Sequence, residues 1–209
     1  MKIILASSSP RRKDILDGLP VRYSIVHPSA DESVLSGETP LHYASRISSL
    51  KALAVSSQTG EHADAVIIGA DTIVAIGGKI LGKPRDFNDA FGMLRSLSGN
   101  THEVITALTV VRRLCFREEA LTRSAMTRVS FKKIGDEEIK QYMSLVDYTD
   151  KAGSYAFQEH RGMIISKVEG SFTNVIGFPL RTFFMILSEM GLAGIVFGVE
   201  TGVAPAEMK

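Results

Sequence analysis

The feature that most constrains the fold is a long apolar segment, residues 65–76, with a single acidic residue in its interior. Two runs rich in β-branched residues, 66–70 and 72–76, flank Asp71. Runs of this kind are typical of strands that are buried in a sheet. The segment therefore predicts a core strand, and it singles out Asp71 as a residue that needs a structural or a chemical explanation.

Further strands are predicted on both sides of this segment. Apolar runs and turn residues place them at 2–6, 21–26, 79–81, 103–113, 120–131 and 163–168. Gly77-Gly78 predicts a tight turn before residues 79–81, and the polar residues 117–119 predict the turn between the two longest strands. A polar loop at 150–155 is expected to lead into another strand.

Helices are predicted where capping residues and prolines precede apolar residues at helical spacing. The ranges are 10–17, 86–97, 136–145 and 179–190. A further helix begins at Pro40, where Tyr43, Ile47, Leu50 and Ala54 follow at helical spacing. Strands and helices alternate early and long hairpin strands follow, which favours an α/β protein with a mixed, twisted sheet. We expect a single domain over residues 1–200 and a frayed tail over 201–209.

Composition argues against several classes of function. The formal net charge of +1 argues against binding to nucleic acid polymers, although a few clustered cations could still hold a small anion. Cys115 is the only cysteine, which excludes an internal disulfide and a cysteine-based metal site, and we expect it in a packed or hairpin position. The sequence contains neither a recognisable signal peptide nor the roughly 20 apolar residues that a membrane span needs, so we expect a cytoplasmic protein.

Two arginines stand in an unfavourable place for a helix. Arg11 and Arg12 fall in the first turn of the predicted helix 10–17, after Ser9 as its cap, where cations oppose the helix dipole. A bound anion would reverse the sign of that interaction. The apolar strand, the serine-rich loop and the two arginines together predict a phosphate site, to which Ser7 and Ser8 could donate. The alternative is that the arginines are solvated and the serines satisfy the loop backbone.

Asp71 has a structural and a chemical explanation. An ionised carboxylate among aliphatic residues is costly unless it is paired or bound to a metal. It could cap the end of a strand. It could instead be a general base or a metal ligand at the carboxyl end of a strand, where ligands of open α/β sheets collect.

Other polar residues complete the candidate set. Three carboxylates (Glu32, Asp71 and Asp150) and five cations (Arg11, Arg12, Lys51, Lys83 and Lys151) suit metal-assisted phosphate chemistry, and Gln158 could present its amide to a nucleobase. The alternative for each residue other than Asp71 is that it is an ordinary solvated side chain on the surface. The histidines show no metal-binding pair spacing and the chain has no Walker motif, which argues against a zinc hydrolase and a P-loop enzyme.

The motifs, taken in order, resemble the Maf (septum formation inhibitor) family of nucleotide pyrophosphatases. The matching segments run from residue 5 to about residue 180. They are Leu5-Ala6-Ser7-Ser8-Ser9-Pro10-Arg11-Arg12, Asp31-Glu32, Ser49-Leu50-Lys51-Ala52, Ile68-Gly69-Ala70-Asp71-Thr72, Leu81-Gly82-Lys83-Pro84, Leu97-Ser98-Gly99-Asn100-Thr101-His102, Asp150-Lys151-Ala152-Gly153-Ser154-Tyr155 and Val175-Ile176-Gly177-Phe178-Pro179-Leu180.

The resemblance implies a two-lobed α/β fold related to inosine triphosphate pyrophosphatases, with the active site in the cleft between the lobes. It also implies a divalent cation, Mg²⁺ or Mn²⁺, and often a homodimer. Position by position, the resemblance makes Asp71 the catalytic acidic residue, which with Glu32 would hold the metal. Phosphate contacts are implied for Ser7, Arg12, Lys51 and Lys83, and Arg11, Thr72 and Gln158 match positions that distinguish the subfamilies.

The combination at those last positions is similar to the type that hydrolyses dTTP and UTP, with modified pyrimidine nucleotides as further substrates. Water would attack the α-phosphorus and pyrophosphate would leave. One departure concerns residues 159–161, where Glu-His-Arg replaces the glycine-rich stretch that is frequent in this type. The alternatives are a 7-methylguanosine triphosphate pyrophosphatase and a nucleotide-binding regulator of cell division without turnover.

Overall fold

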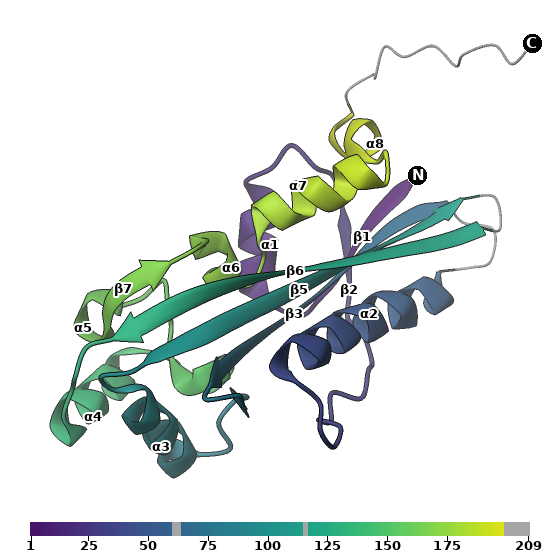
Figure 1. The fold of residues 1–209 in the computed structure, drawn as a ribbon. Coiled ribbons are helices and arrows are strands. Elements are labelled where there is room, and N and C mark those ends of the chain that lie inside the picture. Colours follow the sequence, from purple (N-terminus) through teal and green to yellow (C-terminus); the bar gives the residue numbers. More distant parts are fainter. Residues whose placement is uncertain (60–63, 115–116, 199–209) are drawn as a thin grey trace, which may run out of the picture.

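The computed structural model describes residues 1–59, 64–114 and 117–198 (Figure 1). The predictions for Cys115 and for the tail 201–209 fall outside these residues. Within them the chain forms a sheet of seven strands in the order β2-β1-β3-β5-β6-β7, with β4 paired to β3. The strands are β1 (Lys2–Ala6), β2 (Ser24–Val26), β3 (Ala65–Ile76), β4 (Lys79–Leu81), β5 (Thr101–Leu114), β6 (Arg117–Phe131) and β7 (Ile165–Glu169).

The sheet is mixed, as predicted. Strand β1 runs parallel to β2 and β3, whereas β3, β5, β6 and β7 pair with one another in antiparallel fashion. The helices are α1 (Pro10–Asp17), α2 (Pro40–Gln58), α3 (Phe87–Leu97), α4 (Asp136–Leu145), α5 (Arg161–Ile164), α6 (Phe172–Ile176), α7 (Leu180–Glu189) and α8 (Ala193–Phe197). No helix among the described residues is both long enough and apolar enough to span a bilayer.

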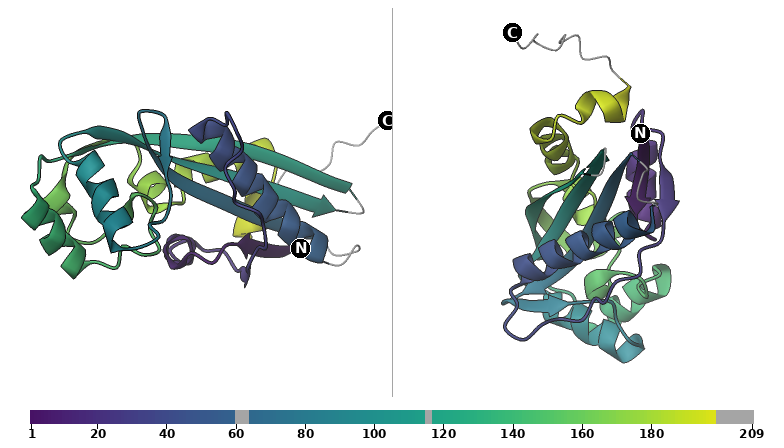
Figure 2. Two further views of the ribbon diagram at one scale, coloured as in Figure 1. Left: turned by 90° about the horizontal axis from the view of Figure 1, so that it is seen from below. Right: turned by 90° about the vertical axis from the view of Figure 1, so that its right-hand side faces the viewer.

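Helices cover both faces of the long strands (Figures 1 and 2). Because side chains alternate along a strand, residues 71 and 73 of β3 point to one face and residues 70, 72 and 74 to the other. Ile73 packs with Tyr43 and Ile47 of α2, and we call this the α2 face. Ala70 packs with Phe183 of α7, and we call the opposite side the α7 face. The sheet is therefore the middle layer of the protein.

Helix α2 begins where the sequence predicts, but it turns a different side to the sheet. Thr39 caps it by accepting a hydrogen bond from the backbone N–H of His42. Leu50, one of the apolar residues at helical spacing, is 38% exposed. Lys51 is buried in its place because it finds carboxylate partners under the helix, which local apolar spacing does not reveal.

The turn predicted at 117–119 is also wrong, because these residues are the first of β6. They lie opposite the last residues of β5, where Glu118 pairs with Arg113 and Glu119 with Arg112. Opposite charges on facing strands stabilise the ladder, so a polar sequence continues as strand here.

Three further differences concern irregular segments. The second strand is shorter than predicted, since it begins at Ser24. The loop at 150–155 contains a short 3₁₀ turn, Ala152–Ser154, and it is followed by irregular chain instead of a strand. Helix α5 occupies the start of the strand predicted at 163–168, and β7 follows from Ile165.

One histidine of strand β5 has its side chain in the core. His102 is 1% exposed, its Nε2 atom lies 2.9 Å from the Tyr155 hydroxyl, and its ring packs edge-on against Tyr155 and Phe131. Burial lowers the pKa of His102 to about 4. The imidazole is therefore neutral in the folded protein at pH 7.

We expect this histidine to destabilise the protein in mild acid. Between about pH 6.5 and pH 4 the unfolded chain binds a proton that folded His102 does not, so the free energy of unfolding should fall by about 3 kcal/mol across that range. His102→Gln should remove this part of the pH dependence, measured by urea denaturation. His42→Gln, at an exposed histidine of α2, is the control, and equal slopes in the two variants would contradict the prediction.

Candidate active site

A gap in the pairing of β3 creates the candidate site. Strand β1 pairs with β3 only as far as Gly69, and β4 joins it only from Val74. In the described residues, 70–73 of β3 have no neighbouring strand on this side, and we call them the open edge. A cavity of about 650 Å³ lies there and is lined by residues of both sheet faces, Asp71 and Ile73 from one and Thr72 and Val74 from the other.

The predicted position of Asp71 at the end of a strand is wrong. Asp71 lies inside the twelve-residue strand β3, opposite Ala107 of β5. What ends near it is the parallel pairing with β1, two residues earlier at Gly69. The expectation that ligands collect at the carboxyl end of parallel strands therefore applies to β1, while β3 continues past the site.

The cavity brings together every residue that the sequence predicted for the site. They come from the loop after β1, helices α1 and α2, strand β3 and three loops. They are Ser7, Arg11, Arg12, Glu32, Lys51, Asp71, Thr72, Lys83 and Gln158.

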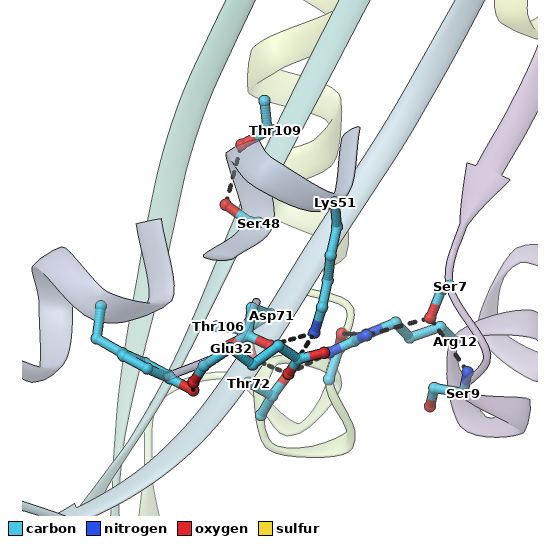
Figure 3. Close-up of polar contacts among 12 residues, drawn as sticks. Ser7, Ser9, Arg12, Glu32, Ser48, Lys51, Asp71, Thr72, Thr106 and Thr109 are labelled. Carbon is cyan, nitrogen blue, oxygen red and sulfur yellow. Dashed lines mark hydrogen bonds and ion pairs between the residues drawn. The ribbon is translucent and has the colours of Figure 1, made fainter. Parts of the chain in front are cut away.

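On the α2 face, Lys51 lies between two carboxylates (Figure 3). Its Nζ atom is 2.8 Å from Asp71 Oδ1 and 3.0 Å from Glu32 Oε2. The side chains of Lys51 and Asp71 are only 10% and 8% exposed. Because a buried charge is costly without a partner, Lys51 and Asp71 each supply the counter-charge that the other needs.

Tyr43 lies on the buried side of α2, as Lys51 does, and it holds the loop that carries Glu32. Its hydroxyl donates to the backbone carbonyl of Glu32 at 2.8 Å. Burial, followed by the charges of Asp71 and Glu32, raises the pKa of Tyr43 to about 12, so the hydroxyl remains a donor. The sequence did not identify Tyr43 as part of the site, although its spacing from Lys51 on α2 is consistent with a shared face.

The two carboxylates fit a divalent cation that is shared with a ligand. Each carboxylate contacts Lys51 through one oxygen, which leaves its second oxygen for another partner. Among the described residues, no group of three or more acidic, histidine or cysteine side chains could hold a metal without help. Mg²⁺ is commonly bound by one or two carboxylates together with substrate phosphates and water. The carboxylates of Asp71 and Glu32 are consistent with such a coordination.

Arg12 reaches the cavity from the α7 face and is largely engaged by the protein. Its Nε atom donates to the Gly177 carbonyl at 2.9 Å, Nη1 to Ser7 Oγ at 3.1 Å and Nη2 to Thr72 Oγ1 at 3.0 Å (Figure 3). Burial lowers the pKa of Arg12, and the charge of Asp71 opposes that shift. An arginine has five N–H donors, so two remain for a ligand.

The first turn of α1 is open to the cavity. Ser9 occupies the predicted cap position, but its side chain makes no capping hydrogen bond, and the backbone N–H of Ser9 donates to Ser7 Oγ instead. Residues 7–12 all line the cavity. Uncapped N–H groups at a helix start attract an anion, so this turn could hold a phosphate, and the phosphate site stays a prediction.

An ion pair links α1 to the loop at 150–155. Arg11 Nη1 lies 3.1 Å from Asp150 Oδ2, and Lys151 Nζ lies 2.9 Å from Asp150 Oδ1. Asp150 and Lys151 both line the cavity, although the sequence assigned them no role beyond the inventory of charges. Arg11 is thus held in place before any ligand binds.

The part of the cavity on the α7 face is mostly apolar. Val74, Val104, Ala156, Phe157 and Val175 line it and belong to one core cluster. Gln158 follows Phe157 and adds an amide. An apolar wall with a few placed polar groups is typical of a site for a flat organic group.

Comparisons with known proteins agree with the motifs. A family model described as Maf-like protein matches residues 2–190. The chain is 40% identical over 191 residues to a dTTP/UTP pyrophosphatase of Hahella chejuensis. The aligned part covers 91% of this chain and 93% of that protein. Proteins of the same name from Clostridioides difficile and Akkermansia muciniphila are 37% and 42% identical, covering 95% and 90% of this chain and 100% and 96% of theirs.

Among solved structures, the Staphylococcus aureus Ham1 protein is similar with a TM-score of 0.47 and 12% identity. The alignment covers 91% of this chain and 100% of that one. A likeness of this degree carries no conclusion about function.

Proposed function

The chain belongs to the Maf family, and we propose that it hydrolyses dTTP and UTP to the nucleoside monophosphate and pyrophosphate. The observation that supports this most is the meeting of the candidate residues in one cavity, with carboxylates and Lys51 on one face of β3 and an apolar wall on the other. A nucleotide needs both kinds of surface, one for its phosphates and one for its base.

In the proposed reaction, a water oxygen forms a bond with the α-phosphorus, and the bond from that phosphorus to the oxygen leading to the β-phosphorus breaks. Asp71 orients the water and accepts its proton, or it serves as a metal ligand instead. The phosphates would be bound by four side chains, which are those of Ser7, Arg12, Lys51 and Lys83. The three cations among them would offset the charge on the leaving pyrophosphate.

We also propose a divalent cation, Mg²⁺ or Mn²⁺, as the cofactor, held by Asp71 and Glu32 together with the substrate phosphates. When bound, such a cation polarises the phosphate group and neutralises part of its charge. The homodimer and the cytoplasmic location remain predictions as well.

We expect Arg11 and Gln158 to act on base choice. Arg11→Ala and Gln158→Ala should each lower the ratio of kcat/KM for UTP to that for GTP by about two- to tenfold, since a hydrogen bond to a neutral group contributes about 0.5–1.5 kcal/mol. Arg85→Ala is the matched control, because Arg85 is highly exposed and pairs with Asp89. Equal losses on every nucleotide would contradict a role in base choice.

A panel of nucleoside triphosphates, assayed for pyrophosphate with and without Mg²⁺ or Mn²⁺, tests the proposed function. Metal-dependent release of pyrophosphate, highest with dTTP and UTP, is the expected result. Preference for 7-methylguanosine triphosphate would overturn the substrate assignment. Tight nucleotide binding in calorimetry without any product would overturn the enzymatic role and favour a regulator.

A further inference from the structure

A chain of hydrogen bonds runs from Arg12 into the core behind the cavity. Arg12 Nη2 donates to Thr72 Oγ1 at 3.0 Å, and Thr72 Oγ1 lies 3.0 Å from Thr106 Oγ1. Thr106 Oγ1 lies in turn 2.9 Å from the backbone carbonyl of Asn174. Thr106 and Asn174 are both 0% exposed, whereas Thr72 lines the cavity.

The chemistry of the two ends sets the direction of this chain. A guanidinium only donates hydrogen bonds and a backbone carbonyl only accepts them, while a threonine hydroxyl has one proton. All three contacts are satisfied only if Thr106 donates to the Asn174 carbonyl and Thr72 donates to Thr106. The proton of Thr72 is therefore used inside the protein, and only an acceptor lone pair is left for a ligand.

Asn174 makes the inner end of the chain rigid. Its side-chain Oδ1 accepts from the backbone N–H of Thr106 at 3.2 Å, and its Nδ2 donates to the Val104 carbonyl and to Thr127 Oγ1, both at 2.9 Å. A flipped amide would place its NH₂ group against the N–H of Thr106 and lose all three bonds. The side chain of Asn174, which does not line the cavity, thus holds in place the backbone carbonyl that accepts from Thr106.

Thr72 lies on the side of β3 that carries the apolar wall. It points to the α7 face, as Val74 does, while Asp71 points to the α2 face with Lys51. Thr106 of β5 is its register partner on the same face. The lone pair of Thr72 is therefore available on the side of the cavity that suits a nucleobase, apart from the carboxylates.

We propose that Thr106 and Asn174 are positioning residues that make the Thr72 hydroxyl a fixed acceptor, and that the cavity thereby selects bases with an N–H donor at that point. Uracil and thymine carry such a donor at N3, between two carbonyls, whereas N3 of cytosine is an acceptor. The inference rests on the proposed function and adds a reason for discrimination between uracil or thymine and cytosine.

The test compares two buried threonines of β5. Thr106→Val removes the group that receives the Thr72 proton, which frees Thr72 to donate to cytosine, so the ratio of kcat/KM for UTP to that for CTP should fall about three- to tenfold. Thr109→Val is the matched control, because Thr109 is equally buried and bonds to Ser48 and Thr122 on the other face. Its ratio should stay within about twofold of the wild-type value.

Two further variants distinguish the loss of a hydroxyl group from a general disturbance of the fold. Thr106→Ser retains a hydroxyl and should restore the wild-type ratio. Thr72→Val removes donor and acceptor together, so it should lower activity on UTP without raising activity on CTP. Melting temperatures report whether each variant is folded.

Several outcomes would overturn the inference. One is an equal change of the UTP/CTP ratio in Thr106→Val and Thr109→Val, and another is an unchanged ratio in folded Thr106→Val. A third is a ratio in Thr106→Ser that equals the ratio in Thr106→Val. The last is a wild-type protein that releases pyrophosphate from UTP and CTP with equal kcat/KM. The last of these would leave the proposed function standing. A wild-type protein that releases no pyrophosphate from any nucleotide would instead overturn the proposed function, and this inference with it.

Discussion

Asp71→Asn should lower the turnover of dTTP and UTP by about 10²-fold or more, because either a general base or a metal ligand is lost. The fold should survive, since Lys51 keeps Glu32 as a partner at 3.0 Å. Pyrophosphate release at saturating nucleotide is the measurement. Glu119→Gln is the control, because Glu119 pairs with Arg112 at the far end of the β5–β6 hairpin. Near-normal turnover in Asp71→Asn would remove this residue from the chemistry.

The same variant distinguishes the two roles of Asp71 when the metal concentration is varied. If Asp71 is mainly a metal ligand, more Mn²⁺ should recover part of the lost activity, because weaker binding is overcome by mass action. If Asp71 is mainly a base, the loss should be the same at every metal concentration. A titration of activity against Mn²⁺ for wild type and variant measures the difference.

Lys51→Met should destabilise the protein by about 3 kcal/mol, because it removes the cation from a buried pair and leaves the Asp71 carboxylate without its partner. Methionine keeps much of the length of the lysine side chain, so the change is mainly one of charge. The free energy of unfolding from urea denaturation is the measurement. For a chain of 209 residues, this loss corresponds to a fall in Tm of about 10 °C.

A double variant tests the cause of this loss. Lys51→Met combined with Asp71→Asn should be more stable than Lys51→Met alone, since the unpaired charge is then absent. Lys167→Met is the control, because Lys167 is 64% exposed and its pair with Glu169 should contribute less than about 1 kcal/mol. A Lys51→Met protein as stable as wild type would show that the pair does not stabilise the fold.

Local signals in the sequence predicted much of this fold. Helices α1 and α4 and strands β1 and β4 lie where caps, prolines and Gly77-Gly78 place them, because these residues constrain the backbone within a few positions. The mixed sheet followed from the order of the predicted elements. Asp71 was identified as a site residue because a charge among aliphatic residues needs a partner wherever the strand lies.

What the sequence did not reveal depends on distant parts of the chain. The burial of Lys51 instead of Leu50 depends on Asp71, which lies twenty residues away. The open edge beside Asp71 depends on where β1 and β4 stop pairing with β3, at Gly69 and Val74. Asn174 carries no local signal, since an asparagine in a short helix is as compatible with the surface as with the core, and its partners lie 47 to 70 residues away.

The open edge of β3 also bears on how such an enzyme can change. Asp71 and Thr72 are consecutive, so a single peptide unit holds the carboxylate that we propose to be catalytic and the hydroxyl that we propose to face the base on opposite sides of the sheet. On this proposal, substitutions among Val74, Val104 and Val175 would reshape the base side without moving Lys51 or Glu32. New substrates can thus be acquired by changing one wall of the cavity, while the bond that is cut stays the same.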